Sequence, residues 1–179
     1  MKRTVKTIRD MESRVTDTHH QALKLWLRLL SCTTRIEGIV RTRLRREFET
    51  TLPRFDLLAQ LERQPDGLTM GELSQRLMVT GANVTGLTDQ LEAEGLVTRV
   101  VHPHDRRSFA VRLTAAGRRQ FRRMAAVHEQ WIVELLAGWH GRQQSQMYAL
   151  LAELKAHLDG VPDAVVRRRL KNGAKENAA

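Results

Sequence analysis

The spacing of apolar residues predicts one long helix early in the chain, over residues 17–50. Its apolar residues form two stripes, the first of Leu23, Leu27 and Leu30 and the second of Leu25, Leu29, Cys32, Ile36 and Ile39. Two stripes on one helix require burial on more than one side. A small domain rarely covers both sides of so long a helix, whereas a second copy of the chain could do so.

Three shorter helical patterns follow in the middle of the chain. Pro53 begins the first, where its missing N–H costs nothing. Thr69 and Glu72 are spaced as a capping box that opens the second. Gly95 stands where the third needs a left-handed C-terminal residue. The residues predicted to face inward are Leu73, Leu77 and Met78 in the second helix and Val84, Leu87 and Leu91 in the third.

Two short strands joined by a charged loop are predicted next. Residues 96–101 are rich in β-branched side chains, and residues 109–113 alternate between apolar and other side chains. Phe109, Val111 and Leu113 are expected on one face of the second strand, with Ala110 and Arg112 on the other. The polar segment 102–108 between the strands is predicted to be a hairpin loop.

Two long helices are predicted towards the end of the chain. Thr114 suits the cap of the first, which runs to about residue 138, and the second covers 141–158. The apolar residues expected to face inward are Phe121, Met124, Ala125, Trp131, Ile132, Leu135 and Leu136 in the first helix and Met147, Leu150, Leu151, Leu154 and Leu158 in the second. The segment 131–139 has more apolar surface than one small lobe would cover, which favours a homodimer.

The order of these elements predicts a mainly α fold with a small β-hairpin wing, a winged helix-turn-helix flanked by long dimerisation helices. We expect an N-terminal arm at 1–16, a dimerisation helix at 17–50 and a winged helix-turn-helix lobe at 51–113. Two dimerisation helices at 114–160 and a basic tail at 161–179 complete the chain.

Charge limits the partners that such a fold could have. The chain of 179 residues carries a formal net charge of +10, which favours nucleic acid, anionic lipid or an acidic protein as partner. The early apolar stretch is broken by Lys24 and Arg28, which excludes a signal peptide or membrane span there. Cys32 is the one cysteine, as expected in a reducing compartment, so we expect a cytoplasmic protein.

Short polar side chains mark a candidate recognition helix after residue 80. With Val84, Leu87 and Leu91 inward, Asn83 and Thr85 can face outward, and Thr80 precedes the helix. Asn can pair with adenine in the major groove, and Thr can bond to a base or touch a thymine methyl. Capping of the helix by Thr80 and Asn83 is the alternative.

The predicted wing carries Asp105, Arg106 and Arg107. An arginine here suits the narrow minor groove, where negative potential is concentrated, and Asp105 could hold one arginine extended. A solvated hairpin tip is the alternative.

The chain shows no nucleophile–base pair, phosphate loop or carboxylate cluster, so we expect neither catalysis, nor a metal site, nor a cofactor.

A series of short motifs runs through this lobe, densely from about 52 to 117. They are Leu73, Ser74 and Leu77; Val84, Thr85 and Leu91; residues 94–97 with Arg99; His102 and Pro103 with residues 105–108; and Leu113, Thr114 and Gly117. The series resembles the MarR family of transcriptional regulators. The resemblance implies a homodimer on pseudo-palindromic operator DNA, with Arg107 in the minor groove, Asp105 positioning it, and a small ligand that relieves repression.

The effector of such a regulator is a separate question. Segments 51–56 and 81–86 resemble a MarR subgroup that controls the breakdown of phenolic acids and responds to hydroxycinnamoyl-CoA thioesters such as p-coumaroyl-CoA or feruloyl-CoA. The predicted cleft wall is Trp26, Leu30 and Phe55, and Arg41 and Arg45 are the predicted phosphate contacts. Simple core residues and solvated arginines are the alternatives.

Other functions stay open from the sequence. A MarR-type regulator could sense a different aromatic compound or a redox signal, although the apolar stripe around Cys32 favours a buried structural cysteine. A sequence-independent architectural DNA binder or an adaptor for an acidic protein would use the same positive charge.

Overall fold

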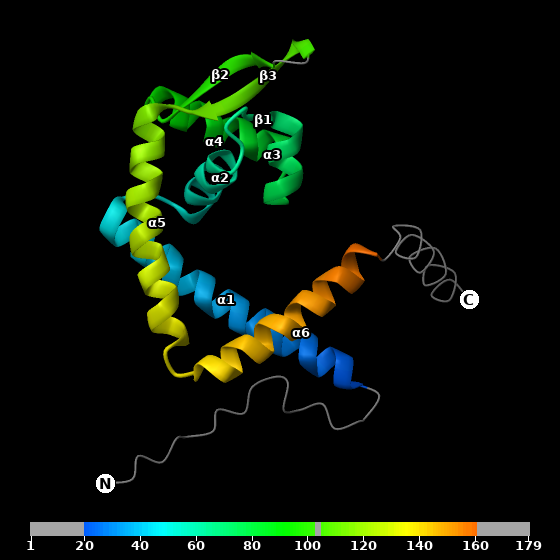
Figure 1. The fold of residues 1–179 in the computed structure, drawn as a ribbon. Helices are drawn as coiled ribbons and strands as arrows, with labels where there is room; N and C mark the ends of the chain where they lie inside the picture. The colour runs from blue at the N-terminus through cyan, green and yellow to red at the C-terminus, as the bar shows by residue number, and fades with distance from the viewer. Residues whose placement is uncertain (1–19, 103–104, 161–179) are drawn as a thin grey trace, which may run out of the picture. The chain divides into compact units, whose positions relative to one another are not determined.

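A computed structural model describes residues 20–102 and 105–160, without the side chains of 102–108. The predicted arm at 1–16 and tail at 161–179 lie outside the described residues. The chain divides into two compact units, Met1–Val133 and Glu134–Ala179, and each is described by itself. In chain order the elements are α1 (Gln21–Phe48), α2 (Leu52–Glu62), β1 (Leu68–Thr69), α3 (Met70–Leu77), α4 (Gly81–Ala93), β2 (Val97–His102), β3 (Asp105–Leu113), α5 (Ala115–Leu136) and α6 (Gly141–Asp159) (Figure 1).

This order confirms the predicted mainly α fold with a small wing.

Several helices begin or end at the capping residues that the sequence predicts. The Thr69 N–H donates to Glu72 Oε2 at 2.8 Å and the Glu72 N–H donates to Thr69 Oγ1 at 3.3 Å, which closes the capping box of α3. The Gly117 N–H donates to Thr114 Oγ1 at 3.0 Å at the start of α5. Gly95 has φ +70°, the left-handed conformation predicted after α4.

The sheet is antiparallel with strand order β1-β3-β2. The β1 strand was not predicted, because two residues are too few to show alternation. The β3 strand begins at Asp105, inside the segment predicted to be a loop. Strand pairing is regular from Phe109 to Leu113, as the expected alternation requires, but burial does not follow one face: Ala110 and Val111 are both buried and Phe109 is exposed. Phe109 and its partner Val101 are both exposed, and they lie nearer the hairpin turn than the residues of β3 that pair with β1.

One hydrophobic core holds the first unit together. It gathers Val40 and Leu44 of α1 with residues of α2, α3, α4, the sheet and α5, and α2, α3 and α4 lie on one side of the sheet in Figure 1. Its fully buried large side chains are Leu44, Leu57, Leu58, Leu61, Leu68, Leu73, Leu91 and Met124. Only the C-terminal part of α1 therefore contributes buried side chains to this core.

The rest of α1 and all of α6 leave apolar side chains in solvent in a single chain. Leu23, Leu25, Trp26 and Leu30 are exposed on α1. The expectation that α6 turns its leucines inward is wrong for one chain: the exposed large apolar residues of α6 are Tyr148, Leu150, Leu151 and Leu158.

Three further residues differ from expectation, of which Leu136 of α5, predicted to face inward, is 37% exposed. Cys32 is exposed in one chain, not buried, because α1 extends beyond the core at that point. Met78 is 91% exposed, not inward, because it has φ +53° and ends α3 in the left-handed conformation. That backbone turns the Met78 side chain away from the face that carries Leu73.

Gly117 sits where α5 passes the backbone of Leu96, in the short connection between α4 and β2. A Cβ at this position would lie 1.9 Å from the Leu96 carbonyl oxygen, a backbone atom that cannot swing away. We expect Gly117→Ala to lower the free energy of unfolding by about 1–3 kcal/mol or more, measured by urea denaturation. Gly71→Ala is the matched control, since its Cβ would meet nothing within 4 Å. Equal stabilities for the two variants would contradict the close approach.

Candidate nucleic-acid interface

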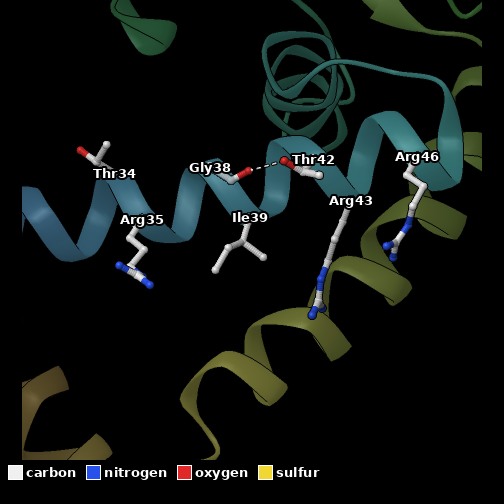
Figure 2. A pocket seen from close by; sticks show the side chains of 7 residues that line it. All are labelled: Thr34, Arg35, Gly38, Ile39, Thr42, Arg43 and Arg46. Atoms are coloured by element: carbon white, nitrogen blue, oxygen red, sulfur yellow. Dashed lines mark hydrogen bonds between the residues drawn. The ribbon is translucent and has the colours of Figure 1, made fainter. Parts of the chain in front are cut away.

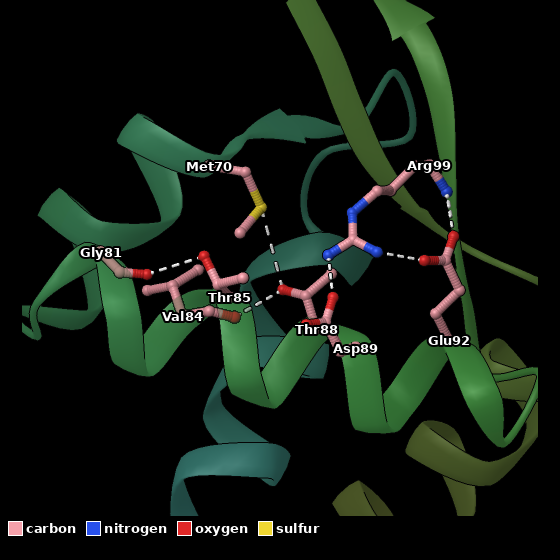
Figure 3. Close-up of polar contacts among 8 residues, drawn as sticks. All are labelled: Met70, Gly81, Val84, Thr85, Thr88, Asp89, Glu92 and Arg99. Carbon is pink, nitrogen blue, oxygen red and sulfur yellow. Dashed lines mark hydrogen bonds and ion pairs between the residues drawn. The ribbon is translucent and has the colours of Figure 1, made fainter.

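The outward face of α4 is set by the residues that it buries. Val84, Thr88 and Leu91 have no exposed surface, whereas Asn83 and Thr85 are exposed. Thr88 was not predicted as a core residue, because a threonine in an apolar stripe looks like an interruption. Its hydroxyl donates to the Val84 carbonyl oxygen at 2.8 Å, which satisfies the polar atom locally and makes burial tolerable (Figure 3).

The N-terminal end of α4 presents small and polar groups to solvent. Thr80 is its N-cap residue, with extended backbone, and its carbonyl oxygen accepts from the Val84 N–H at 3.2 Å. Thr85 is exposed, and its hydroxyl donates to the Gly81 carbonyl oxygen at 3.0 Å, which leaves the hydroxyl oxygen able to accept a hydrogen bond. Within this described helix, the first turn has no acidic side chain, so the positive end of the helix dipole is not neutralised there.

The wing is the β2–β3 hairpin. The strands stay paired from Val97 with Leu113 out to His102 with Asp105, and an irregularity falls between Val101 and His102. The predicted site residues Asp105, Arg106 and Arg107 belong to β3, but their side chains lie outside the described part of the structure.

Arg99 joins the wing to α4, a contact that sequence analysis missed. Its backbone N–H donates to Glu92 Oε1 at 2.9 Å, and its guanidinium forms ion pairs with Glu92 and Asp89 (Figure 3). The hydrogen bond to Asp89 is the largest cause that raises the pKa of Arg99. Asp89 and Glu92 stand three residues apart on a helix, a spacing that could have suggested a shared cation.

Other ion pairs connect the helices of the same unit. Arg54 of α2 pairs with Glu94 at the end of α4. Glu62, near the end of α2, pairs with Arg118 and Arg122 of α5, at 2.7 Å and 3.2 Å. Both ends of α2 are therefore fixed to neighbouring helices.

The predicted effector wall is not brought together within one chain. Phe55 is buried, and its ring centroid lies 5.5 Å from that of Phe121 and 4.9 Å from that of His128. Burial lowers the pKa of His128. Trp26 and Leu30 are exposed on α1. Trp26 lies eighteen residues before Leu44, the α1 residue that packs in the core with Phe55, which is about 27 Å along a helix.

The arginines of α1 occupy different sides of the helix. A shallow hollow of about 540 Å³ lies along one side of α1, and Arg35, Arg43 and Arg46 of the helix are among the residues that line it (Figure 2). The other lining residues are Thr34, Gly38, Ile39 and Thr42. The Arg43 guanidinium also lies 5.8 Å from the Trp131 ring centroid. The predicted phosphate contacts Arg41 and Arg45 are exposed but do not line this hollow.

Comparisons with known proteins agree on one family. Residues 49–108 match the sequence pattern of the MarR family. A MarR family transcriptional regulator from Silicibacter pomeroyi, of known crystal structure, is 32% identical with a TM-score of 0.68, over 80% of this chain and 99% of that protein. The transcriptional regulator PecS of Dickeya dadantii is 26% identical over 63% of this chain and 69% of its own length.

A more distant structure is also similar in fold. CouR from Rhodococcus jostii, crystallised with p-coumaroyl-CoA, has a TM-score of 0.63 at 21% identity, over 78% of this chain and 95% of CouR. At that identity the likeness shows the fold alone.

No helix within the described ranges 20–102 and 105–160 has the length and apolar character needed to cross a membrane.

Proposed function

The chain belongs to the MarR family of winged helix-turn-helix transcriptional regulators, and from that premise we propose that it is a ligand-responsive repressor acting as a homodimer on pseudo-palindromic operator DNA. The observation that carries the proposal is the outward N-terminal end of α4, where Asn83 and Thr85 face solvent. A net charge of +10 adds attraction for phosphates.

We assign base contacts to Asn83 and Thr85 in the major groove, with Thr80 beside them at the start of α4. An Asn side chain offers a donor and an acceptor, which match the edge of adenine. The helix dipole favours the approach of phosphates to the same end of α4. In the wing, Arg107 is assigned to the minor groove, with Arg106 beside it and Asp105 holding the arginine extended.

Two copies of the chain explain the apolar side chains that one copy leaves exposed. Leu25 and Trp26 of α1 and Leu150 and Leu158 of α6 are all more than half exposed. Large exposed apolar groups on two long helices mark an interaction surface. A two-fold dimer would cover them and present two α4 helices to two half-sites about one DNA turn apart.

Base reading by Asn83 is tested by Asn83→Ala. We expect binding to a duplex selected by the parent protein from a random library to weaken by about 1–3 kcal/mol, with relaxed preference at one position in each half-site. Gln90→Ala is the control, since Gln90 is also exposed on α4 but lies two turns further from the N-terminus. Unchanged sequence preference in Asn83→Ala would refute the assignment.

Arg107 should behave differently, because a minor-groove arginine acts mainly through charge. We expect Arg107→Ala to weaken binding to the selected duplex and to lower the slope of log affinity against log salt concentration by about one unit. Fluorescence anisotropy titrations at four salt concentrations measure both quantities. An unchanged slope together with unchanged affinity would remove Arg107 from the interface.

We propose an aromatic acyl-CoA thioester, such as p-coumaroyl-CoA, as the effector that releases DNA, in control of aromatic acid breakdown. Two observations support it: CouR, which shares the fold, was crystallised with that compound, and α1 is unusually rich in arginine. The polyanionic CoA suits these arginines, and the apolar aromatic group suits Trp26 and Leu30, with Phe55 as the third predicted wall residue.

The arginines allow two modes of CoA contact. Arg41 and Arg45 remain the proposed phosphate contacts, and the hollow on α1 offers Arg35 and Arg46 as the alternative pair. Release of DNA follows if the ligand prefers a lobe spacing that DNA does not accept, or if its phosphates occupy a basic surface that DNA needs.

Calorimetry with the thioester, the free phenolic acid and free CoA tests this effector. We expect tight binding and release of the selected duplex only with the thioester, since each half alone loses the other half's contacts. The double variants Arg41→Ala/Arg45→Ala and Arg35→Ala/Arg46→Ala remove equal formal charge from different sides of α1, and the second also removes the ion pair of Arg46 with Glu47. The variant that binds the thioester more weakly identifies the phosphate contacts, and Glu47→Gln serves as the control for the lost ion pair. If the free acid binds as tightly as the thioester and releases DNA equally well, the acyl-CoA proposal fails.

A further inference from the structure

Two carboxylates lie on the side of α4 that carries a proposed base-reading residue. Thr85, Asp89 and Glu92 are spaced i, i+4 and i+7, so they share one face of the helix. Both acidic residues belong to the second half of α4, beyond the turn that presents Asn83. Negative charge on a DNA-facing side is repelled by the phosphate backbone, so it needs a compensating cation.

Arg99 supplies that cation from a different element. Its guanidinium contacts Asp89 with one terminal nitrogen and Glu92 with the other, while its backbone N–H donates to Glu92 Oε1 at 2.9 Å (Figure 3). The planar guanidinium has two separate donor edges, which suits a bridge between two carboxylates. Because Arg99 stands within β2 opposite Val111, the bridge ties the second half of α4 to the wing hairpin.

The position of this bridge suggests a role other than stability. The three side chains are partly exposed, with 29% for Arg99, 35% for Glu92 and 57% for Asp89. Ion pairs in such surroundings contribute little to the free energy of unfolding. Yet α4 and the wing are the two elements assigned to the two grooves, so a small rotation between them would misplace one set of contacts.

We propose that Arg99 is a positioning residue for DNA recognition, which locks α4 to the wing and neutralises the two carboxylates on the side of α4 that faces the operator. The proposal rests on the proposed function, since it assumes that α4 reads bases. Arg99 itself need not touch DNA: it acts through the placement of Asn83 and Thr85.

A double-mutant cycle separates positioning from direct contact. The probe is a duplex selected from a random library by the parent protein, and the four proteins are the parent, Arg99→Ala, Asn83→Ala and the double variant. We expect Arg99→Ala to weaken binding at least tenfold with little change in melting temperature. The loss caused by Asn83→Ala should shrink markedly in the Arg99→Ala background, because a misplaced helix no longer makes the Asn83 contact.

Two further variants sharpen the result. Arg99→Lys keeps the charge but cannot bridge two carboxylates, so we expect binding between that of the parent and Arg99→Ala. Arg118→Ala is the matched control: it removes one positive charge from another ion pair of the same unit, with Glu62, and should leave the effect of Asn83→Ala intact.

The outcomes distinguish this inference from the function on which it rests. Additive losses from Arg99→Ala and Asn83→Ala, with a salt slope lower by about one unit, would make Arg99 a phosphate contact and overturn positioning. Unchanged binding of Arg99→Ala would also overturn it, while leaving the proposed function intact. A parent protein that binds selected and random duplexes equally would overturn both.

Discussion

The burial of one side of α4 is the constraint on which the DNA-binding lobe depends. Val84, Thr88 and Leu91 are fully enclosed, so the rotation of the helix about its axis is fixed and Asn83 and Thr85 must face outward. Thr88 meets this constraint with a hydroxyl, because its local hydrogen bond to the Val84 carbonyl removes the cost of burying a polar atom. Packing selects the face of α4, and Arg99 ties the end of α4 that is farther from Asn83 to the hairpin.

The long helices pose the opposite problem, since they carry more apolar surface than one chain covers. Val40 and Leu44 join the core, but the earlier part of α1 continues into solvent with Trp26 exposed. Solvated apolar side chains on α1 and on α6 are costly, and covering them by a second copy recovers that free energy. Dimerisation would then stabilise the fold and present two recognition helices together.

Much of this fold could be predicted because local signals agree with the packing. The capping box at Thr69, the left-handed Gly95 and the spacing of Val84 and Leu91 each depend on near neighbours in sequence. Met78 could not be placed, because its spacing continues the apolar stripe of α3 while its backbone has already left the helix. Alternation likewise did not reveal that Phe109 is exposed, because it gives the face of a strand residue and not whether other elements cover that face.

The candidate site was predictable to a different degree. The outward direction of Asn83 follows from helical periodicity, whereas the Arg99 bridge joins two elements and becomes visible only in three dimensions. Cys32 was expected to be buried because its stripe is apolar, but it is exposed, since the core that buries Val40 and Leu44 does not extend to this part of α1. The arginines of α1 were visible as a group, while their division between two sides of the helix came from the structure.

We propose that two copies of this chain place two α4 helices on one operator. Sedimentation velocity of the full chain with a selected duplex of known length measures it directly, through the mass of the complex. We expect two chains per duplex, and twice the chain mass of 20.5 kDa for the protein alone at micromolar concentration. A folded monomer that binds the duplex as a single chain would contradict it.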